Sequence, residues 1–120
     1  MFDVTKADDV SILHLYGDLS LMEMEFLEKA IQSFKNCRHT KIVLDLARVD
    51  YLHLRAAQSL ARQAVELRRN DGDLKITGAG DQLREALKFV GADQGLKDYA
   101  SIAEAILSFL KRRQRDERML

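Results

Sequence analysis

Residues that could carry chemistry are few in this sequence, and they stand far apart. The three histidines, His14, His39 and His53, have no partners at metal-ligand spacing, and Cys37 has only His39 near it, two residues further on. Metal sites use three or four such ligands at short, regular spacings, so we expect no metal site. No serine has the glycine flanks of a nucleophile elbow. We therefore expect no catalytic residues, no cofactor and no enzyme activity.

Two other patterns come close to chemical motifs without completing them. Gly78-Ala79-Gly80 precedes a helical pattern but lacks the Lys-Ser/Thr ending of a P-loop and the spacing of a dinucleotide fingerprint. We interpret it as a turn that requires small residues. Asp45 lies in a strand pattern, as the phosphorylated aspartate of a receiver domain does, but the acidic pair of a receiver would have to be Asp8-Asp9, which here joins two strands. The sequence therefore disfavours both readings, and we expect His14 to make an ordinary hydrogen bond from its strand.

Length and composition indicate one soluble domain. The chain has 120 residues, the size of a single domain. Nineteen acidic residues balance nineteen basic ones, which leaves no positive excess for nucleic acid. We find no signal peptide and no apolar run long enough for membrane insertion. A single cysteine allows no internal disulfide, and Cys37, at the end of a helical apolar pattern, is expected to be buried. We expect a cytoplasmic protein.

The spacing of apolar residues predicts strands that alternate with helices after an initial hairpin. Period-two alternation and short apolar runs predict strands over 2–6, 10–16, 42–46, 74–77 and 96–99. Helical spacing predicts helices over 21–38, 54–69, 81–90 and from 102 onward. Ser20 with Glu23 forms a capping-box pattern, and Ser101 is the expected cap of the last helix.

This order predicts an α/β fold in a single domain. The expected architecture is a mixed β-sheet, an initial hairpin followed by parallel βα crossovers, with about four packed helices. The domain should cover residues 1–110. Residues 111–120 are expected to be a charged helix end or tail, whose Lys and Arg residues suit the last turn of a helix. A contact with an acidic partner or a membrane surface is the alternative for this tail.

Five short motifs, in order and spacing, resemble a STAS domain, the fold of bacterial anti-sigma factor antagonists. The resemblance covers residues 2 to about 110 and implies the same α/β architecture. The motifs correspond to the exit from the second strand, the central strand with its loop, the glycine turn into the fourth strand, the end of the third helix and the last helix. They are Leu15-Tyr16-Gly17-Asp18-Leu19, the segment 42–52, Asp71-Gly72 before Leu74-Lys75-Ile76, the segment 87–93 and the segment 102–106.

The chain departs from the family pattern where the family carries its switch. STAS antagonists typically read Asp-Ser-Ser/Thr-Gly at the start of the second helix, and a partner kinase phosphorylates the serine. His53, Leu54, Arg55 and Ala56 occupy these positions here. Leu54 stands at the serine position and cannot accept a phosphate, which would add about −1.5 to −2 charge at this helix N-terminus. The resemblance therefore implies the fold without its phosphorylation site.

The resemblance implies a non-enzymatic protein-interaction module in bacterial signalling or regulation. Tyr51 and Leu54 are the expected apolar anchors, and Arg55 the expected charge contact. The full set of expected partner-binding residues is Tyr51, Leu52, His53, Leu54, Arg55 and Gln58. By the same resemblance, the partner would be an anti-sigma kinase-like protein, a larger complex of STAS proteins or a transporter subunit.

Two alternative functions remain open from the sequence. One is a STAS sensor that binds a nucleotide or small ligand, with weak support from Gly78-Ala79-Gly80 and Arg55. The other is a homo-oligomeric structural module, for which Met22, Met24 and Phe26 are the candidate surface residues of the first helix.

Overall fold

The computed structural model describes residues 1–118, and from residue 111 onward the backbone alone. Its elements follow the predicted order, except that a 3-10 helix, which the sequence did not predict, precedes the last strand, and that this strand is shorter than the predicted 96–99. They are β1 (Phe2–Ala7), β2 (Val10–Leu19), α1 (Leu21–Asn36), β3 (Lys41–Leu52), α2 (Leu54–Arg69), β4 (Asp73–Thr77), α3 (Asp81–Phe89), the 3-10 helix η1 (Ala92–Gln94), β5 (Asp98–Tyr99) and α4 (Ile102–Arg118). The side chains of the predicted tail 111–120 lie outside the described residues.

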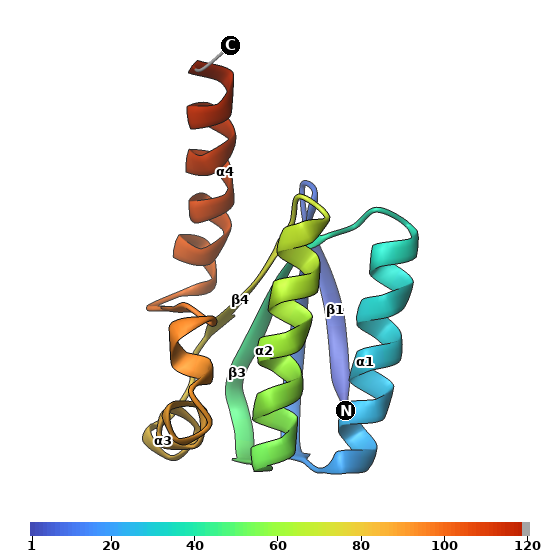
Figure 1. Cartoon of the computed structure of the whole chain (residues 1–120), viewed down its shortest axis with the longest axis vertical. Helices are drawn as coiled ribbons and strands as arrows, with labels where there is room; N and C mark the ends of the chain where they lie inside the picture. The colour runs from blue at the N-terminus through green and yellow to red at the C-terminus, as the bar shows by residue number, and fades with distance from the viewer. Residues whose placement is uncertain (119–120) are drawn as a thin grey trace.

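The strands form one mixed sheet in the order β1-β2-β3-β4-β5 (Figure 1). The β1–β2 pair is antiparallel, and the other three neighbouring pairs are parallel. This is the hairpin followed by parallel crossovers that the element order predicts. The α/β fold class with four helices is confirmed.

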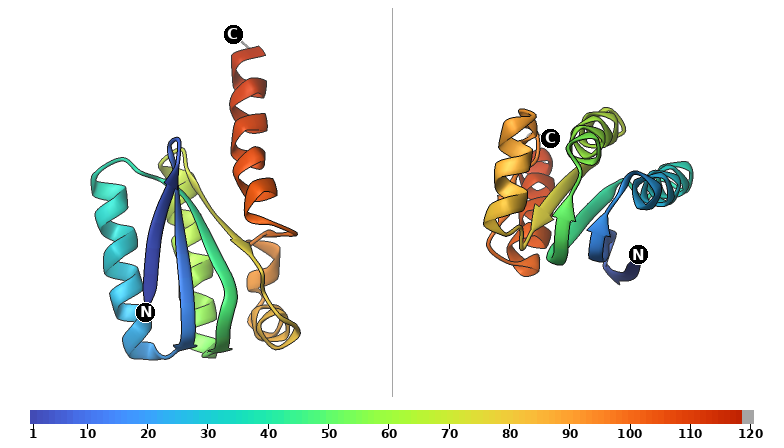
Figure 2. Two further views of the ribbon diagram at one scale, coloured as in Figure 1. Left: turned by 180° about the vertical axis from the view of Figure 1, so that it is seen from behind. Right: turned by 90° about the horizontal axis from the view of Figure 1, so that it is seen from below.

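The helices cover the two faces of the sheet unequally. The first three helices pack on one face, where residues such as Leu27, Leu60 and Leu83 join Leu13 and Leu44 in the main core. Helix α4 packs on the other face, where Ala105 and Phe109 contact a smaller apolar cluster of the strands. Figure 2 shows α4 beside one end of that face, with no helix over β1 and the lower parts of β2 and β3. The second face is therefore only half covered.

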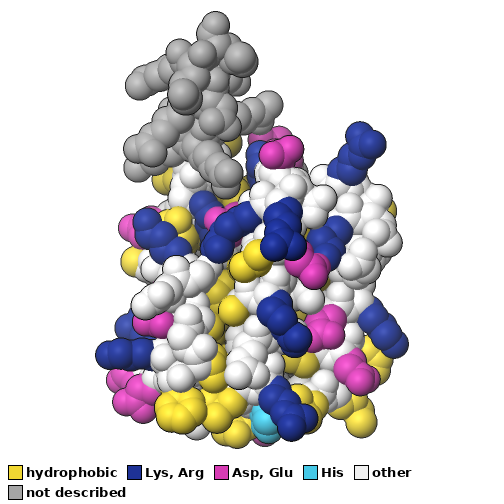
Figure 3. Space-filling view, in the orientation of Figure 1, with side chains coloured by type: hydrophobic (Ala, Val, Ile, Leu, Met, Phe, Trp, Pro, Cys, Tyr) yellow, Lys and Arg dark blue, Asp and Glu magenta, His cyan; other side chains and the backbone are white. Residues whose placement is uncertain are grey.

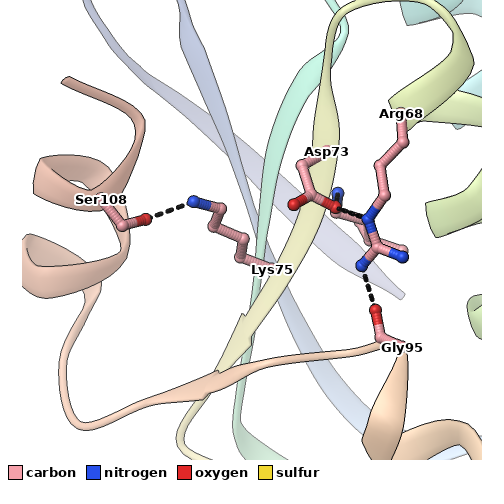
Figure 4. A network of polar contacts seen from close by, with 6 residues as sticks. Arg68, Asp73, Lys75, Gly95 and Ser108 are labelled. Carbon is pink, nitrogen blue, oxygen red and sulfur yellow. Dashed lines mark hydrogen bonds and ion pairs between the residues drawn. The ribbon is translucent and has the colours of Figure 1, made fainter. Parts of the chain in front are cut away.

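Polar contacts hold the outer elements in place (Figure 4). Lys75 of β4 is buried, donates a hydrogen bond to the Ser108 hydroxyl and lies 4.0 Å from the centroid of the Phe109 ring, so it ties α4 to the sheet. Arg68 of α2 bonds Asp73 at 2.9 Å and also donates to the Gly95 carbonyl. These bonds join the end of α2 to the start of β4 and to the loop after η1.

Two strands are longer than the period-two pattern predicts. Strand β2 continues past residue 16 to Leu19, and β3 continues past residue 46 to Leu52. The β2–β3 register shifts between His14 and Tyr16 and again after Gly17, which has a φ of 86°. Such irregularities interrupt the alternation of faces without ending the strand, so the period-two pattern stops before the strands do.

Two local expectations for α1 were wrong in part. Cys37 is exposed, because it caps the end of α1 beyond the last residues that reach the sheet. The Ser20 hydroxyl does accept a bond from the Glu23 amide at 3.3 Å. The Glu23 carboxylate, however, pairs with the amino group of Met1 at 2.6 Å, so the capping box is not reciprocal. The expected Ser101 cap on α4 is present, at 3.1 Å from the Glu104 amide.

Gly72 sits where the turn between α2 and β4 crosses the start of β3, and it supplies a first prediction. A Cβ at this position would lie 2.0 Å from the Thr40 carbonyl oxygen. The positions of the added Cβ atom and of the Thr40 carbonyl oxygen are both fixed by the backbone, so neither atom can rotate away from the other. We expect Gly72→Ala to lower the free energy of unfolding by about 1–3 kcal/mol, measured by urea denaturation. Gly95→Ala, whose Cβ would meet nothing closer than 3.8 Å, is the matched control and should be near neutral.

Candidate functional site

The two parallel strands β2 and β3 end together, and a helix begins directly after each. Leu19 pairs with Leu52 in the β2–β3 register, and the His53 amide donates to the Leu19 carbonyl at 3.3 Å. The N-caps Ser20 and His53 follow these paired residues immediately. The N-termini of α1 and α2 therefore lie side by side at one edge of the sheet.

Helices α1 and α2 run parallel from this edge. Ser59 of α2 is buried and donates a hydrogen bond to the Glu28 carboxylate of α1, and Lys35 of α1 bonds Glu66 of α2 at 2.5 Å. Both pairs join residues 31 positions apart, so the two helices stay in register along their length. The hydrogen bond and the charge of the Lys35 ammonium lower the pKa of the Glu66 carboxyl.

Exposed apolar side chains gather at the edge where the two helices begin. Tyr51, the penultimate residue of β3, has 44% of its surface exposed, and Leu54 opens α2 with 41% exposed. On α1, Met22 is 69% and Phe26 57% exposed. Figure 3 shows hydrophobic side chains along this lower end of the molecule, with a histidine among them. We call the set Leu21, Met22, Phe26, Tyr51 and Leu54 the apolar corner.

His53 holds the start of α2 in place. Its backbone is extended, with φ −66° and ψ 144°, and its Nδ1 atom accepts a hydrogen bond from the Arg55 amide at 3.1 Å. Only an unprotonated ring nitrogen can accept this bond. The first turn of α2 contains no acidic residue. The helix N-terminus is therefore capped by an imidazole.

Five of the six residues expected to bind a partner have side chains that reach the surface at this edge. Tyr51, Leu54, Arg55 and Gln58 are exposed, and His53 is half-buried. Leu52 is different, because it is 3% exposed and belongs to the main core. It positions the corner and offers no contact surface.

The sequence also missed part of this surface and misplaced one residue. Leu21, Met22 and Phe26 are exposed at the same edge. The sequence pattern indicated Met22 and Phe26 only as residues for self-association and did not connect them with Tyr51 and Leu54. Met24, expected among those surface residues, is 3% exposed and packs in the main core. The helical period puts it on the opposite face of α1 from Met22, as the apolar stripe through Met24, Leu27 and Ile31 shows.

The glycine-rich turn after β4 has a packing role. Gly78 has a φ of 76°, and a Cβ there would lie 2.9 Å from the Ala47 backbone nitrogen. This close approach explains why the turn needs small residues. Within the described residues, no three His, Cys, Asp or Glu side chains form a group that could hold a metal, and no helix is long and apolar enough to cross a bilayer.

Comparison with known families identifies the fold. Residues 2–110 match the family model described as "Mlab, STAS domain". The chain belongs to the STAS family. No curated protein matches the sequence. The family match spans the region expected to form the domain and includes both helices of the apolar corner.

Solved structures of similar fold agree with this assignment. An anti-sigma factor antagonist from Mycobacterium paratuberculosis is 22% identical, with a TM-score of 0.79 and coverage of 91% of this chain and 92% of that chain. A Thermotoga maritima protein provisionally described as an anti-sigma factor antagonist is 21% identical, with a TM-score of 0.82 and coverage of 90% and 93%. The anti-sigma factor antagonist SpoIIAA in its unphosphorylated form is 17% identical, with a TM-score of 0.70 and coverage of 88% and 93%.

The imidazole cap gives a prediction for stability. We expect His53→Ala to lower the free energy of unfolding by about 1 kcal/mol, because the Arg55 amide loses its acceptor, and we expect His53→Asn to retain most of it. Chemical denaturation followed by circular dichroism measures both. His39→Ala is the control histidine, since His39 caps no helix. Equal loss in His53→Ala and His53→Asn would contradict a capping role.

Proposed function

We propose that this STAS domain is a non-enzymatic interaction module in bacterial signalling or regulation. It binds a protein partner through the apolar corner, with Arg55, His53 and Gln58 at its polar rim. The observation that carries the proposal is the gathering of five exposed apolar side chains where α1 and α2 begin. Contiguous exposed apolar surface on a small domain is typical of an interaction site.

The anatomy of the corner suits a protein partner better than a small ligand. Tyr51 and Phe26 are aromatic anchors of the kind that dominate interface energetics. Charged groups border them, with Arg55 exposed on α2 and Glu23 half-buried on α1. A nucleotide or small-ligand sensor remains the alternative function, but the turn at Gly78 is filled by its packing against Ala47.

The proposed contact is constitutive rather than phosphorylation-controlled. In SpoIIAA, solved in unphosphorylated and in phosphorylated forms, the antagonist itself carries the modification. Here the first residue of α2 is Leu54, which offers an apolar side chain and no hydroxyl. Binding would then be set by the amounts of the two proteins, not by a kinase acting on this corner.

Three kinds of partner fit the proposal: an anti-sigma kinase-like protein, other STAS proteins in a larger complex, or a transporter subunit. The family model's name points to an Mlab protein. The murine anion transporter Slc26a9 contains a region of similar fold, with a TM-score of 0.72, 18% identity and coverage of 86% of this chain and 18% of that chain. The experiments below distinguish a partner at the corner from self-association.

A charge placed in the corner should weaken partner binding without harming the fold. We expect Leu54→Asp to weaken the complex by about 2 kcal/mol, roughly 30-fold in Kd. A carboxylate in the first turn suits the helix dipole, so the thermal midpoint should not fall. Binding is measured by calorimetry with a partner captured from the native host, and Arg55→Glu and Met22→Asp test the rim and the α1 side.

Val65→Asp is the matched control for this series. Val65 is also an exposed apolar residue of α2, at 45%, but it lies more than two turns beyond the corner. Wild-type affinity in Leu54→Asp, Arg55→Glu and Met22→Asp would remove the apolar corner as the site. If wild-type protein sediments as a dimer that Met22→Asp or Phe26→Asp dissociates, the corner binds a second copy of this chain instead.

The absence of a switch can be checked directly. We expect protein purified from its native host to carry no phosphate on the peptide that spans residues 49–57, because its first helical turn offers no serine or threonine. Phosphopeptide mass spectrometry gives the answer. A phosphate recovered on this peptide would contradict the constitutive contact.

A further inference from the structure

Three polar side chains form a hydrogen-bonded line on the second face of the sheet. They stand on the half of this face that α4 leaves uncovered. On the covered half, Ile12 and Val43 pack against Phe109 of α4. One period further along the same strands, on the same face, stand His14 on β2 and Asp45 on β3, which are partners in the register. Thr5 of the edge strand β1 lies beside them. Figure 2 shows this part of the sheet without a helix over it.

The three side chains are linked in one line. The Asp45 Oδ2 atom lies 2.8 Å from His14 Nδ1, and His14 Nε2 lies 3.0 Å from the Thr5 hydroxyl. Asp45 Oδ1 accepts a further bond from the Ala47 amide at 3.1 Å, which fixes the carboxylate. The distance from His14 Nε2 to the Thr5 hydroxyl lies within the range in which a base can take a proton from a hydroxyl.

The position of His14 between a carboxylate and a hydroxyl determines which of its ring nitrogens carries a hydrogen. An ionised carboxylate only accepts hydrogen bonds, so the Nδ1 atom of His14 carries the hydrogen that it donates to Asp45. In the neutral ring the Nε2 atom then holds a lone pair and accepts the hydrogen of the Thr5 hydroxyl. This is the arrangement of hydroxyl, imidazole and carboxylate that activates a nucleophile in unrelated proteins.

The hydrogen-bonded side chains of Thr5, His14 and Asp45 border a cavity that can admit a small molecule. A cavity of about 290 Å³ is lined by Thr5, His14, Asp45 and their neighbours Asp3, Tyr16 and Arg48. His14 is partly accessible, with 32% of its side chain exposed, and the Asp45 side chain is 20% exposed. Thr5 itself is exposed, so a reactant can approach its hydroxyl from solvent.

We propose that Thr5 is a nucleophile that accepts an acyl group from small uncharged esters, with His14 as the general base and Asp45 as the residue that orients it. Thr5 Oγ1 forms a bond to the acyl carbon as its proton passes to His14 Nε2. The bond from the acyl carbon to the leaving oxygen breaks, and the leaving oxygen takes the electron pair and the proton held on His14 Nε2, so that it departs as the alcohol or phenol and His14 returns to its neutral form. The product is an ester on Thr5.

The charges around the hollow select the class of acyl donor. Two carboxylates, Asp3 and Asp45, face one guanidinium, that of Arg48. Asp45 is already engaged by His14, which leaves Asp3 to repel an anion that Arg48 alone would have to hold. A phosphorylated donor with two negative charges is therefore disfavoured relative to a neutral ester.

The test uses p-nitrophenyl acetate with the full chain. We expect one acetyl group on Thr5, found by peptide mass mapping, with release of p-nitrophenolate. His14→Gln should slow acetylation of Thr5 about 100-fold or more, which is the usual contribution of a general base, and Asp45→Asn should slow it as well. Thr5→Ser should still be acetylated and Thr5→Val should not. Thr5 is exposed on an edge strand, where valine is well tolerated, so the loss cannot be a folding effect.

Two controls separate this reaction from ordinary surface acetylation. His39→Gln removes another histidine and should leave acetylation of Thr5 unchanged, and Thr40 should stay unmodified in the same sample. The proposal is overturned if the label appears only on lysines or His39. It is also overturned if Thr5 is acetylated in His14→Gln as fast as in the wild type.

Discussion

The parallel register between β2 and β3 is the constraint on which both proposed functional surfaces depend. Pairing Leu19 with Leu52 ends the two strands together, so α1 and α2 begin side by side and expose their first apolar residues on one edge. The same register pairs His14 with Asp45 further back along the strands. A slip by one residue would turn every side chain of one strand to the other face. It would separate His14 from Asp45 and misplace the corner.

The two faces of the sheet have different tasks because they are covered differently. Three helices bury the first face, and the large apolar residues of β2, β3 and β4 pack there. Within the described residues, α4 is the helix that packs on the second face. Phe109 holds it in the smaller apolar cluster, and the ammonium of Lys75 on β4 lies over the Phe109 ring. The uncovered half of this face must be polar to stay in water. That requirement places charged and hydroxyl side chains close together on neighbouring strands, where cross-strand pairs form readily.

The start of α2 divides two requirements between two residues. A helix N-terminus needs an acceptor for its free amides, and the Nδ1 atom of His53 accepts from the Arg55 amide. Leu54, the first residue of α2, adds exposed apolar surface beside this cap. The cap is met by any good acceptor, so it does not restrict which side chain the first helical residue exposes.

Sequence alone determined the order of elements, the fold class and the span of α2, because apolar periodicity, glycine turns and caps are local signals. It also led to the expectation that Leu54 stands at the serine position of the family pattern, which depends only on residue identity. The tertiary structure decided how far β2 and β3 extend, because bulges break the period without breaking the pairing. It also decided which residues from distant segments meet. Leu21, Met22 and Phe26 share an edge with Tyr51 and Leu54, and Thr5 meets His14 and Asp45, because strand register brings together residues that no local spacing connects.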